Sequence, residues 1–107
     1  MATTVPMSEA QWQKRITDYC DLLNLMWHHE TDSRKSKRGF PDLVIVGPYG
    51  VLFLELKRQK GKATAEQVRW IKAINDAAGR AAIVRPHDWP VVKRMLDGIA
   101  GRDRFTL

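Results

Sequence analysis

Apolar and polar positions alternate with helical spacing in the first quarter of the chain. Apolar side chains recur at intervals of four, three and four residues, at Trp12, Ile16, Tyr19 and Leu23. This spacing puts them on one face of a helix. Residues 8–11 (Ser-Glu-Ala-Gln) have the S-x-x-Q form of a capping box, which is typical of a helix start. We therefore expect a helix over 8–24, then a short strand over 26–30 and a polar loop over 31–41.

Two short apolar segments in the middle of the chain predict paired strands. Residues 43–46 (Leu-Val-Ile-Val) are rich in β-branched side chains, and residues 51–56 form a second apolar run. The four residues between them, Gly-Pro-Tyr-Gly at 47–50, are typical of a turn. This arrangement predicts a β-hairpin.

The last part of the chain predicts two more helices with a strand between them. Thr64-Ala65-Glu66-Gln67 is a second capping box, and the helix it begins should run to about Ala78, with Gly79 placed to end it. Its apolar stripe is formed by Trp70, Ile71, Ile74 and Ala78. Residues 81–84 read as a short strand. Asp88-Trp89-Pro90 is typical of a helix start, and the residues expected to face inward are Val91, Val92, Met95, Leu96 and Ile99.

The predicted elements follow the order α-β-β-β-α-β-α. This order indicates a small α/β protein in which helices flank a mixed β-sheet. No repeat, linker or low-complexity segment divides the chain, so we expect a single domain over residues 1–107.

Composition excludes several classes of protein. The 107 residues include one cysteine, Cys20, which can form neither an internal disulfide nor a thiolate metal cluster. A secreted disulfide scaffold and a zinc finger are therefore excluded. No segment approaches the roughly 20 apolar residues of a membrane-spanning helix, and the first nine residues lack the pattern of a signal peptide. We expect an intracellular, cytoplasmic protein without a membrane partner.

The net charge of +6 is concentrated in two short segments, each with four basic residues and no acidic one. The first segment contains Arg34, Lys35, Lys37 and Arg38, and the second contains Lys57, Arg58, Lys60 and Lys62. The rest of the chain holds 10 basic and 12 acidic residues. A single basic run is often a solvated loop. Two such runs on an otherwise slightly acidic chain predict a surface for the phosphates of a nucleic acid.

Two carboxylates are expected to meet at the end of the predicted hairpin. Glu55 interrupts an apolar strand, and strand alternation puts Lys57 on the same face. Asp42 begins the preceding strand, so an antiparallel hairpin brings it beside Glu55. A strand-end ion pair is the structural alternative. Two neighbouring carboxylates repel each other unless a cation lies between them, and Mg²⁺ prefers oxygen ligands. Lys57 at the rim could orient a water or contact a phosphate.

Each of the first two predicted helices carries one polar residue on its apolar face. Glu9 falls on the face of Trp12 and Ile16, and Gln67 lies within the stripe of the second helix. Either residue also has a structural explanation. An acidic side chain in a first turn favours the helix dipole, and Gln67 is the third residue of its capping box.

Taken together, these residues resemble the PD-(D/E)xK nuclease signature. Gly39-Phe40-Pro41-Asp42 is followed, after twelve residues, by Glu55-Leu56-Lys57. The chain is most similar to the virus-type replication-repair nuclease (VRR-NUC) family, over about residues 8–90. The further matching features are Glu9, the string Asp32-Ser33-Arg34 and Gln67. A bare PD…ExK match is a weak signal, whereas this ordered set on the expected elements is specific.

The resemblance implies a restriction-endonuclease-like core and an endodeoxyribonuclease that depends on Mg²⁺ or Mn²⁺. Asp42, Glu55 and the Leu56 carbonyl would bind the metal, Lys57 would position the attacking water, and Glu9 and Gln67 would complete the site. It further implies a homodimer that cuts branched DNA such as a Holliday junction in viral replication or repair. The alternatives are a nuclease for flaps or ends and a DNA-binding module without catalysis.

Overall fold

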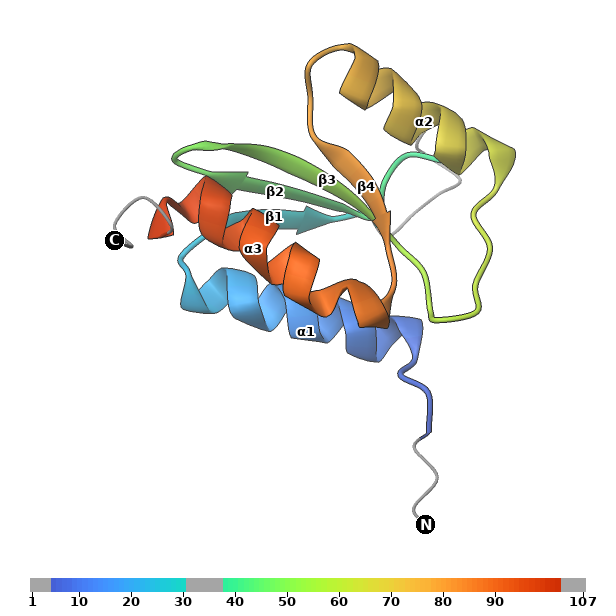
Figure 1. Ribbon diagram of the computed structural model, residues 1–107, viewed down its shortest axis with the longest axis horizontal. Helices are drawn as coiled ribbons and strands as arrows, with labels where there is room; N and C mark the ends of the chain where they lie inside the picture. Colours follow the sequence, from blue (N-terminus) through green and yellow to red (C-terminus); the bar gives the residue numbers. More distant parts are fainter. Residues whose placement is uncertain (1–4, 31–37, 103–107) are drawn as a thin grey trace.

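The computed structural model describes residues 5–30 and 38–102 as one four-stranded sheet with helices on both sides (Figure 1). In chain order the elements are α1 (Glu9–Leu22), β1 (Met26–His29), β2 (Leu43–Gly47), β3 (Gly50–Leu56), α2 (Ala65–Asp76), β4 (Ala81–Val84), the short 3₁₀ helix η1 (Pro86–Asp88) and α3 (Trp89–Ala100). The predicted order α-β-β-β-α-β-α is confirmed, with η1 as an added turn.

The sheet is mixed, as predicted. Its strand order is β1-β2-β3-β4, with antiparallel pairing between β1 and β2 and between β2 and β3. The hairpin closes where Gly47 pairs with Gly50. β4 pairs with β3 in parallel, because α2 carries the chain back before β4 begins. The start of β2 and the ends of β3 and β4 therefore lie at one end of the sheet.

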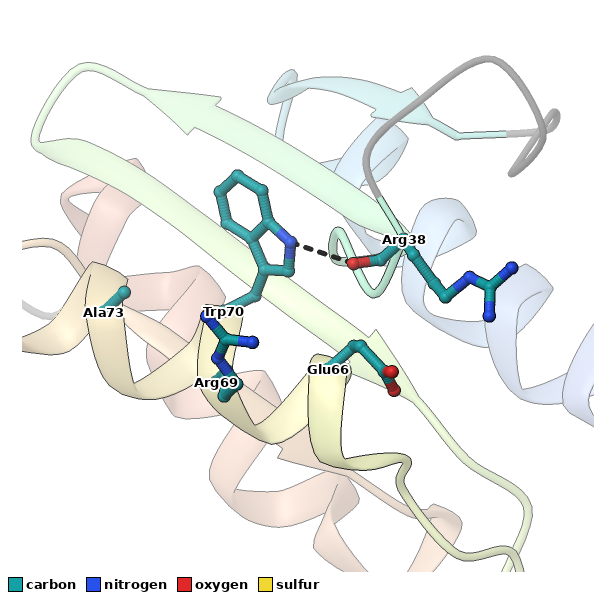
Figure 2. A pocket seen from close by; sticks show the side chains of 5 residues that line it. All are labelled: Arg38, Glu66, Arg69, Trp70 and Ala73. Carbon is teal, nitrogen blue, oxygen red and sulfur yellow. Dashed lines mark hydrogen bonds between the residues drawn. The ribbon is translucent and has the colours of Figure 1, made fainter.

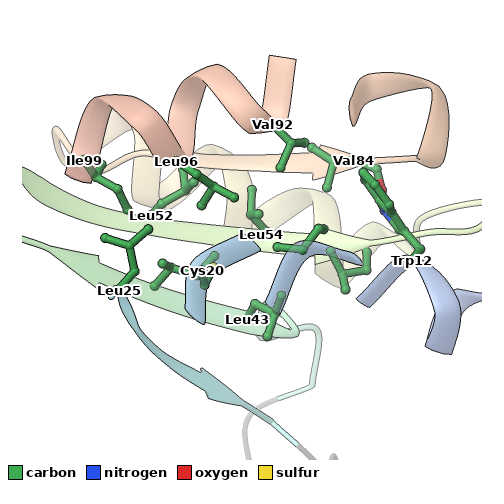
Figure 3. Packing of buried hydrophobic residues seen from close by; sticks show 13 residues of the cluster. Trp12, Cys20, Leu25, Leu43, Leu52, Leu54, Val84, Val92, Leu96 and Ile99 are labelled. Carbon is green, nitrogen blue, oxygen red and sulfur yellow. The ribbon is translucent and has the colours of Figure 1, made fainter. Parts of the chain in front are cut away.

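The hydrophobic core lies between the sheet and the pair α1 and α3, which cover one face together (Figure 1). Leu52 and Leu54 of β3 are buried against these helices (Figure 3). Leu56, the next side chain on that face of the strand, is buried as well. α2 packs on the other face, chiefly over β3 and β4. None of its side chains is fully buried. The opposite face of the sheet is thus only partly covered.

Both capping boxes are confirmed, and the helical stripes are confirmed in large part. Ser8 and Thr64 each accept a hydrogen bond from the backbone N–H three residues later. Val91, predicted to face inward, is 47% exposed, because the buried stripe of α3 is centred one position later, on Val92. Two further predictions at the end of α2 are wrong. Ala78 is exposed beyond the end of the helix, and it adopts the left-handed conformation (φ 68°) in place of Gly79.

The helices are short and carry charged residues on their outer faces. Among the residues that the structure describes, no helix is long and apolar enough to cross a membrane.

Candidate active site

Glu55 is the only charged side chain among the fully buried residues of segments 5–30 and 38–102, with 1% of its surface exposed. The alternation of β3 sends Leu54 and Leu56 into the core and Glu55 to the opposite face, beneath the start of α2. A buried carboxylate is strongly unfavourable unless polar groups or cations surround it. Its surroundings therefore show what the site can do.

Asp42 lies beside Glu55, as the hairpin predicts. The ladder between β2 and β3 ends with Leu43 opposite Leu54, and one further step in the same register brings Asp42 opposite Glu55. The backbone N–H of Leu56 donates a hydrogen bond to Asp42 Oδ2 over 2.8 Å. This bond fixes one carboxylate oxygen of Asp42 against the end of β3.

Gln67 and Lys57 both contact the same oxygen of Glu55. Gln67 Nε2 donates a hydrogen bond to Glu55 Oε2 over 3.0 Å, and Lys57 Nζ lies 3.3 Å from that atom. The other end of the Gln67 amide, Oε1, accepts a hydrogen bond from the backbone N–H of Thr64, so Gln67 also completes its capping box. Gln67 therefore both completes its capping box and contacts Glu55. Lys57 lies at the rim, with 15% of its side chain exposed.

The second oxygen of Glu55 is the unusual atom of the site. Oε1 is buried and has no hydrogen-bond partner among the described residues. Burial, followed by the charge of the neighbouring Asp42, raises the pKa of Glu55 to about 8. Lys57 opposes this shift without cancelling it. A second carboxylate, Asp42, therefore lies beside a buried carboxyl group whose ionisation is disfavoured, which is an arrangement that a bound cation relieves.

These groups fit a hard divalent cation. The available donors are oxygen atoms of Asp42 and Glu55, and Mg²⁺ is commonly bound through one or two carboxylates while it keeps several waters. The unpartnered Glu55 Oε1 is an oxygen for which the protein supplies no other partner in the part that the structure describes. No group of three or more His, Cys, Asp or Glu side chains gathers there as a ready-made metal cage.

Glu9 does not face inward as predicted. It is exposed in the first turn of α1. No hydrogen bond or ion pair within the described residues joins it to Asp42 or Glu55. The indole of Trp12 donates to the carbonyl of Val84 at the end of β4, so α1 begins at the same end of the sheet as the carboxylates. The buried stripe starts only at Trp12, because the first turn of α1 extends past the sheet.

The predicted basic residues can be located only in part. Arg34, Lys35 and Lys37 lie outside the described residues. The others, Arg38, Arg58, Lys60 and Lys62, are exposed. Arg58 and Lys60 line a cavity of about 550 Å³ together with Ser8 at the start of α1.

Glu30 also lies near the two carboxylates, although the sequence predicts no role for it. Its backbone N–H donates to the carbonyl of Asp42 over 2.9 Å, one step beyond the β1–β2 ladder. Glu30 therefore occupies the register position opposite Asp42. The sequence marks 26–30 as a strand, but it contains no signal for the strand's partner or register.

Comparison with known families agrees with this geometry. Residues 7–88 match the VRR-NUC domain, which is more than half of the chain. The chain belongs to the VRR-NUC family. The predicted family is thus confirmed, and the VRR-NUC domain is a nuclease domain. A comparison with curated proteins found no match.

Solved structures show the same fold. A VRR-NUC domain protein superposes with a TM-score of 0.65 at 21% identity, covering 85% of this chain and 87% of the other. A second VRR-NUC domain gives a TM-score of 0.65 at 18% identity, covering 91% and 96%. A Holliday junction resolvase, Hjc from Archaeoglobus fulgidus, gives a TM-score of 0.46 at 20% identity, covering 68% and 67%. The predicted α/β fold is confirmed by the first two.

Proposed function

We propose that this VRR-NUC domain is a divalent-metal-dependent endonuclease that hydrolyses phosphodiester bonds in branched DNA. The observation that carries the proposal is the buried Glu55, whose Oε1 lacks a partner among the described residues while Oε2 is held by Gln67 and Lys57. A purely structural ion pair between Glu55 and Lys57 would not require a second carboxylate, Asp42, beside it. Membership of a nuclease family supports the same conclusion.

Each group has a distinct task in this proposal. Asp42 and Glu55, with the backbone carbonyl of Leu56, would hold Mg²⁺ or Mn²⁺. When bound, the cation lowers the pKa of a coordinated water and neutralises charge on the phosphate. Gln67 keeps the Glu55 carboxylate in one orientation through its bond to Oε2. Lys57, anchored by the same oxygen, directs its remaining N–H groups at the attacking water or the phosphate.

We assign the exposed basic residues to the DNA backbone. Arg58 and Lys60 follow β3 directly, and with Ser8 they line the cavity at the start of α1, where the helix dipole favours a phosphate. Arg38 precedes β2. Cationic side chains therefore lie along the chain on both sides of the carboxylates, and Lys62 extends the second group. Contacts of this kind position the DNA without reading its sequence.

A labelled four-way junction tests the proposal directly. We expect cleavage with Mg²⁺ or Mn²⁺ and none with EDTA. Asp42→Asn should abolish cleavage and keep junction binding, because the amide oxygen still accepts the hydrogen bond from Leu56. The matched control is Asp18→Asn, an exposed carboxylate paired with Lys14, which should cleave normally. Binding without cleavage in the presence of metal would favour a non-catalytic DNA-binding module. Cleavage of flaps or ends alone would favour that class of nuclease.

We further propose that the active form is a homodimer. One domain provides one pair of carboxylates, whereas a symmetric cut of two strands requires two sites. Met26, Val46 and Val51 are cross-strand neighbours on the uncovered face of the sheet, exposed by 74%, 40% and 41%. Adjacent exposed apolar side chains are typical of a contact surface.

Sedimentation measured at assay concentrations tests the dimer. Val46→Asp should shift the protein toward monomer, whereas Val91→Asp, which changes an exposed valine on α3, should not. Paired cuts by a strict monomer would contradict the homodimer and leave the nuclease proposal intact.

A further inference from the structure

A second cavity, of about 460 Å³, lies between α2 and the residues that precede β2 (Figure 2). It is lined by Arg38, Glu66, Arg69, Trp70 and Ala73. Four of these come from α2 at spacings of three, one and three residues, so they share one side of the helix. Ala73 is small and leaves room beside the indole. Glu66, Arg69 and Trp70 have no role in the proposed metal site.

The wall of this cavity is held in place before any ligand binds. The Trp70 indole N–H donates to the carbonyl of Arg38 over 3.1 Å, which Figure 2 shows as a dashed line. The Trp70 ring also packs edge-on against Phe40 at 5.1 Å, and Phe40 packs against Phe53 of β3. Gly39 has φ +90° and lies so close to the helix that a Cβ there would be 2.6 Å from the Glu66 carbonyl carbon. A fixed wall reduces the entropy lost on binding.

The lining groups match the parts of a nucleotide. Guanidinium groups such as that of Arg69 bind phosphate oxygens through paired N–H donors. An indole is a stacking surface for a base. The Glu66 carboxylate accepts hydrogen bonds from amino or ring N–H groups at a base edge. It would repel a plain phosphate, so the combination favours a whole nucleotide over an inorganic anion. Bases paired within a duplex cannot enter such a cavity, whereas an unpaired base can.

Two short chain segments connect the cavity to the proposed metal site. Gln67, which contacts Glu55, directly follows Glu66 on α2. Asp42 lies three residues after Gly39. We propose that this cavity binds one unpaired nucleotide of the DNA next to the cut, so that the enzyme prefers branch points with an unpaired nucleotide over fully paired junctions. This inference rests on the nuclease proposal above for its substrate.

Two branched DNA substrates that differ only in one unpaired nucleotide at the branch point test this preference. We expect the wild type to cleave the unpaired substrate with a kcat/KM about tenfold higher, as stacking of one base would give. Arg69→Ala, an exposed residue, should reduce that ratio toward one. The control Lys72→Ala removes a positive charge from the same helix outside the cavity and should keep the ratio. A wild-type ratio near one, or an unchanged ratio in Arg69→Ala, would overturn the inference.

A contact measurement separates this inference from the nuclease proposal. The unpaired nucleotide is replaced by 5-iododeoxyuridine, the complex is irradiated in EDTA, and the cross-linked peptide is identified by mass spectrometry. We expect the cross-link at Trp70. A cross-link there without cleavage in Mg²⁺ would support the nucleotide site and refute the nuclease. Cleavage in Mg²⁺ with cross-links only at other residues would support the nuclease and refute the nucleotide site.

Discussion

Replacing Glu55 by Gln should remove most of the pH dependence of folding stability in the metal-free protein. The pKa of Glu55 is raised from its ordinary value of 4.5 to about 8, chiefly by burial and the neighbouring Asp42. A folded-state pKa above the unfolded value means that stability is fully present below pH 4.5 and is lost as the pH rises through 8. At about 1.4 kcal/mol per pH unit, the interval between these two pKa values corresponds to a loss of unfolding free energy on the order of 5 kcal/mol, as an upper limit.

Urea unfolding in EDTA at pH 5.5 and pH 8.5 measures this effect. The wild type should lose several kcal/mol of unfolding free energy at the higher pH. Glu55→Gln keeps an oxygen for the hydrogen bond from Gln67 and has no proton to lose, so its two values should nearly coincide. Asp18→Asn, at an exposed carboxylate, should behave like the wild type. A loss in Glu55→Gln as large as that of the wild type would refute the reasoning.

The same variant tests whether the raised pKa belongs to a cation site. At pH 8.5 a cation between the two carboxylates should restore the stability that their repulsion removes. Mg²⁺ at ten times its Kd would add about 1.4 kcal/mol to the wild type. Thermal unfolding with and without Mg²⁺ should show this gain in the wild type and little of it in Glu55→Gln. An equal gain in both proteins would place Mg²⁺ elsewhere on the surface.

Three further substitutions test other parts of the fold and site. Gly39→Ala should lower the unfolding free energy by about 2 kcal/mol, because it combines φ +90° with a close contact to Glu66; a value near zero in urea unfolding would contradict the tight approach. Ala78→Gly should raise it by about 1 kcal/mol, since φ 68° suits glycine, and a loss of stability in the same assay would refute this. Lys57→Met should lower the kcat for junction cleavage by about 100-fold or more with little change in junction Kd; weakened binding with normal kcat would make Lys57 a DNA contact.

The sequence predicts the centre of the site well because local rules determine it. A hairpin with a short turn has few possible registers, so Asp42 and Glu55 could be expected as neighbours, and the structure supplies the exact register. The period of an amphipathic helix likewise predicts that Gln67 faces the sheet. Helical periodicity does not predict where a helix extends past the sheet that covers it. Glu9 continues the apolar face of α1 in the helical period, yet it lies beyond the point where that face is covered.

Features that depend on contacts between distant segments are not predicted. Glu30 lies opposite Asp42 only because β1 pairs with β2, and nothing in residues 26–30 specifies that register. The cavity near Trp70 requires the close approach of Gly39 to Glu66 across 26 intervening residues. The sequence predicts an apolar stripe on α2, but it does not predict that Trp70 and Ile74 of this stripe are only half-buried.

The shallow attachment of α2 makes this helix a natural unit for protein engineering. Hydrogen bonds at three positions along the helix connect it to the remainder of the domain: Gln67 to Glu55, Trp70 to Arg38, and Asn75 to Ala81. A designer could therefore graft new residues onto its outer surface, or exchange the whole helix, while leaving the interior side chains untouched. Provided that those three anchors are kept, the proposed preference for an unpaired nucleotide could be changed without changing the proposed metal site.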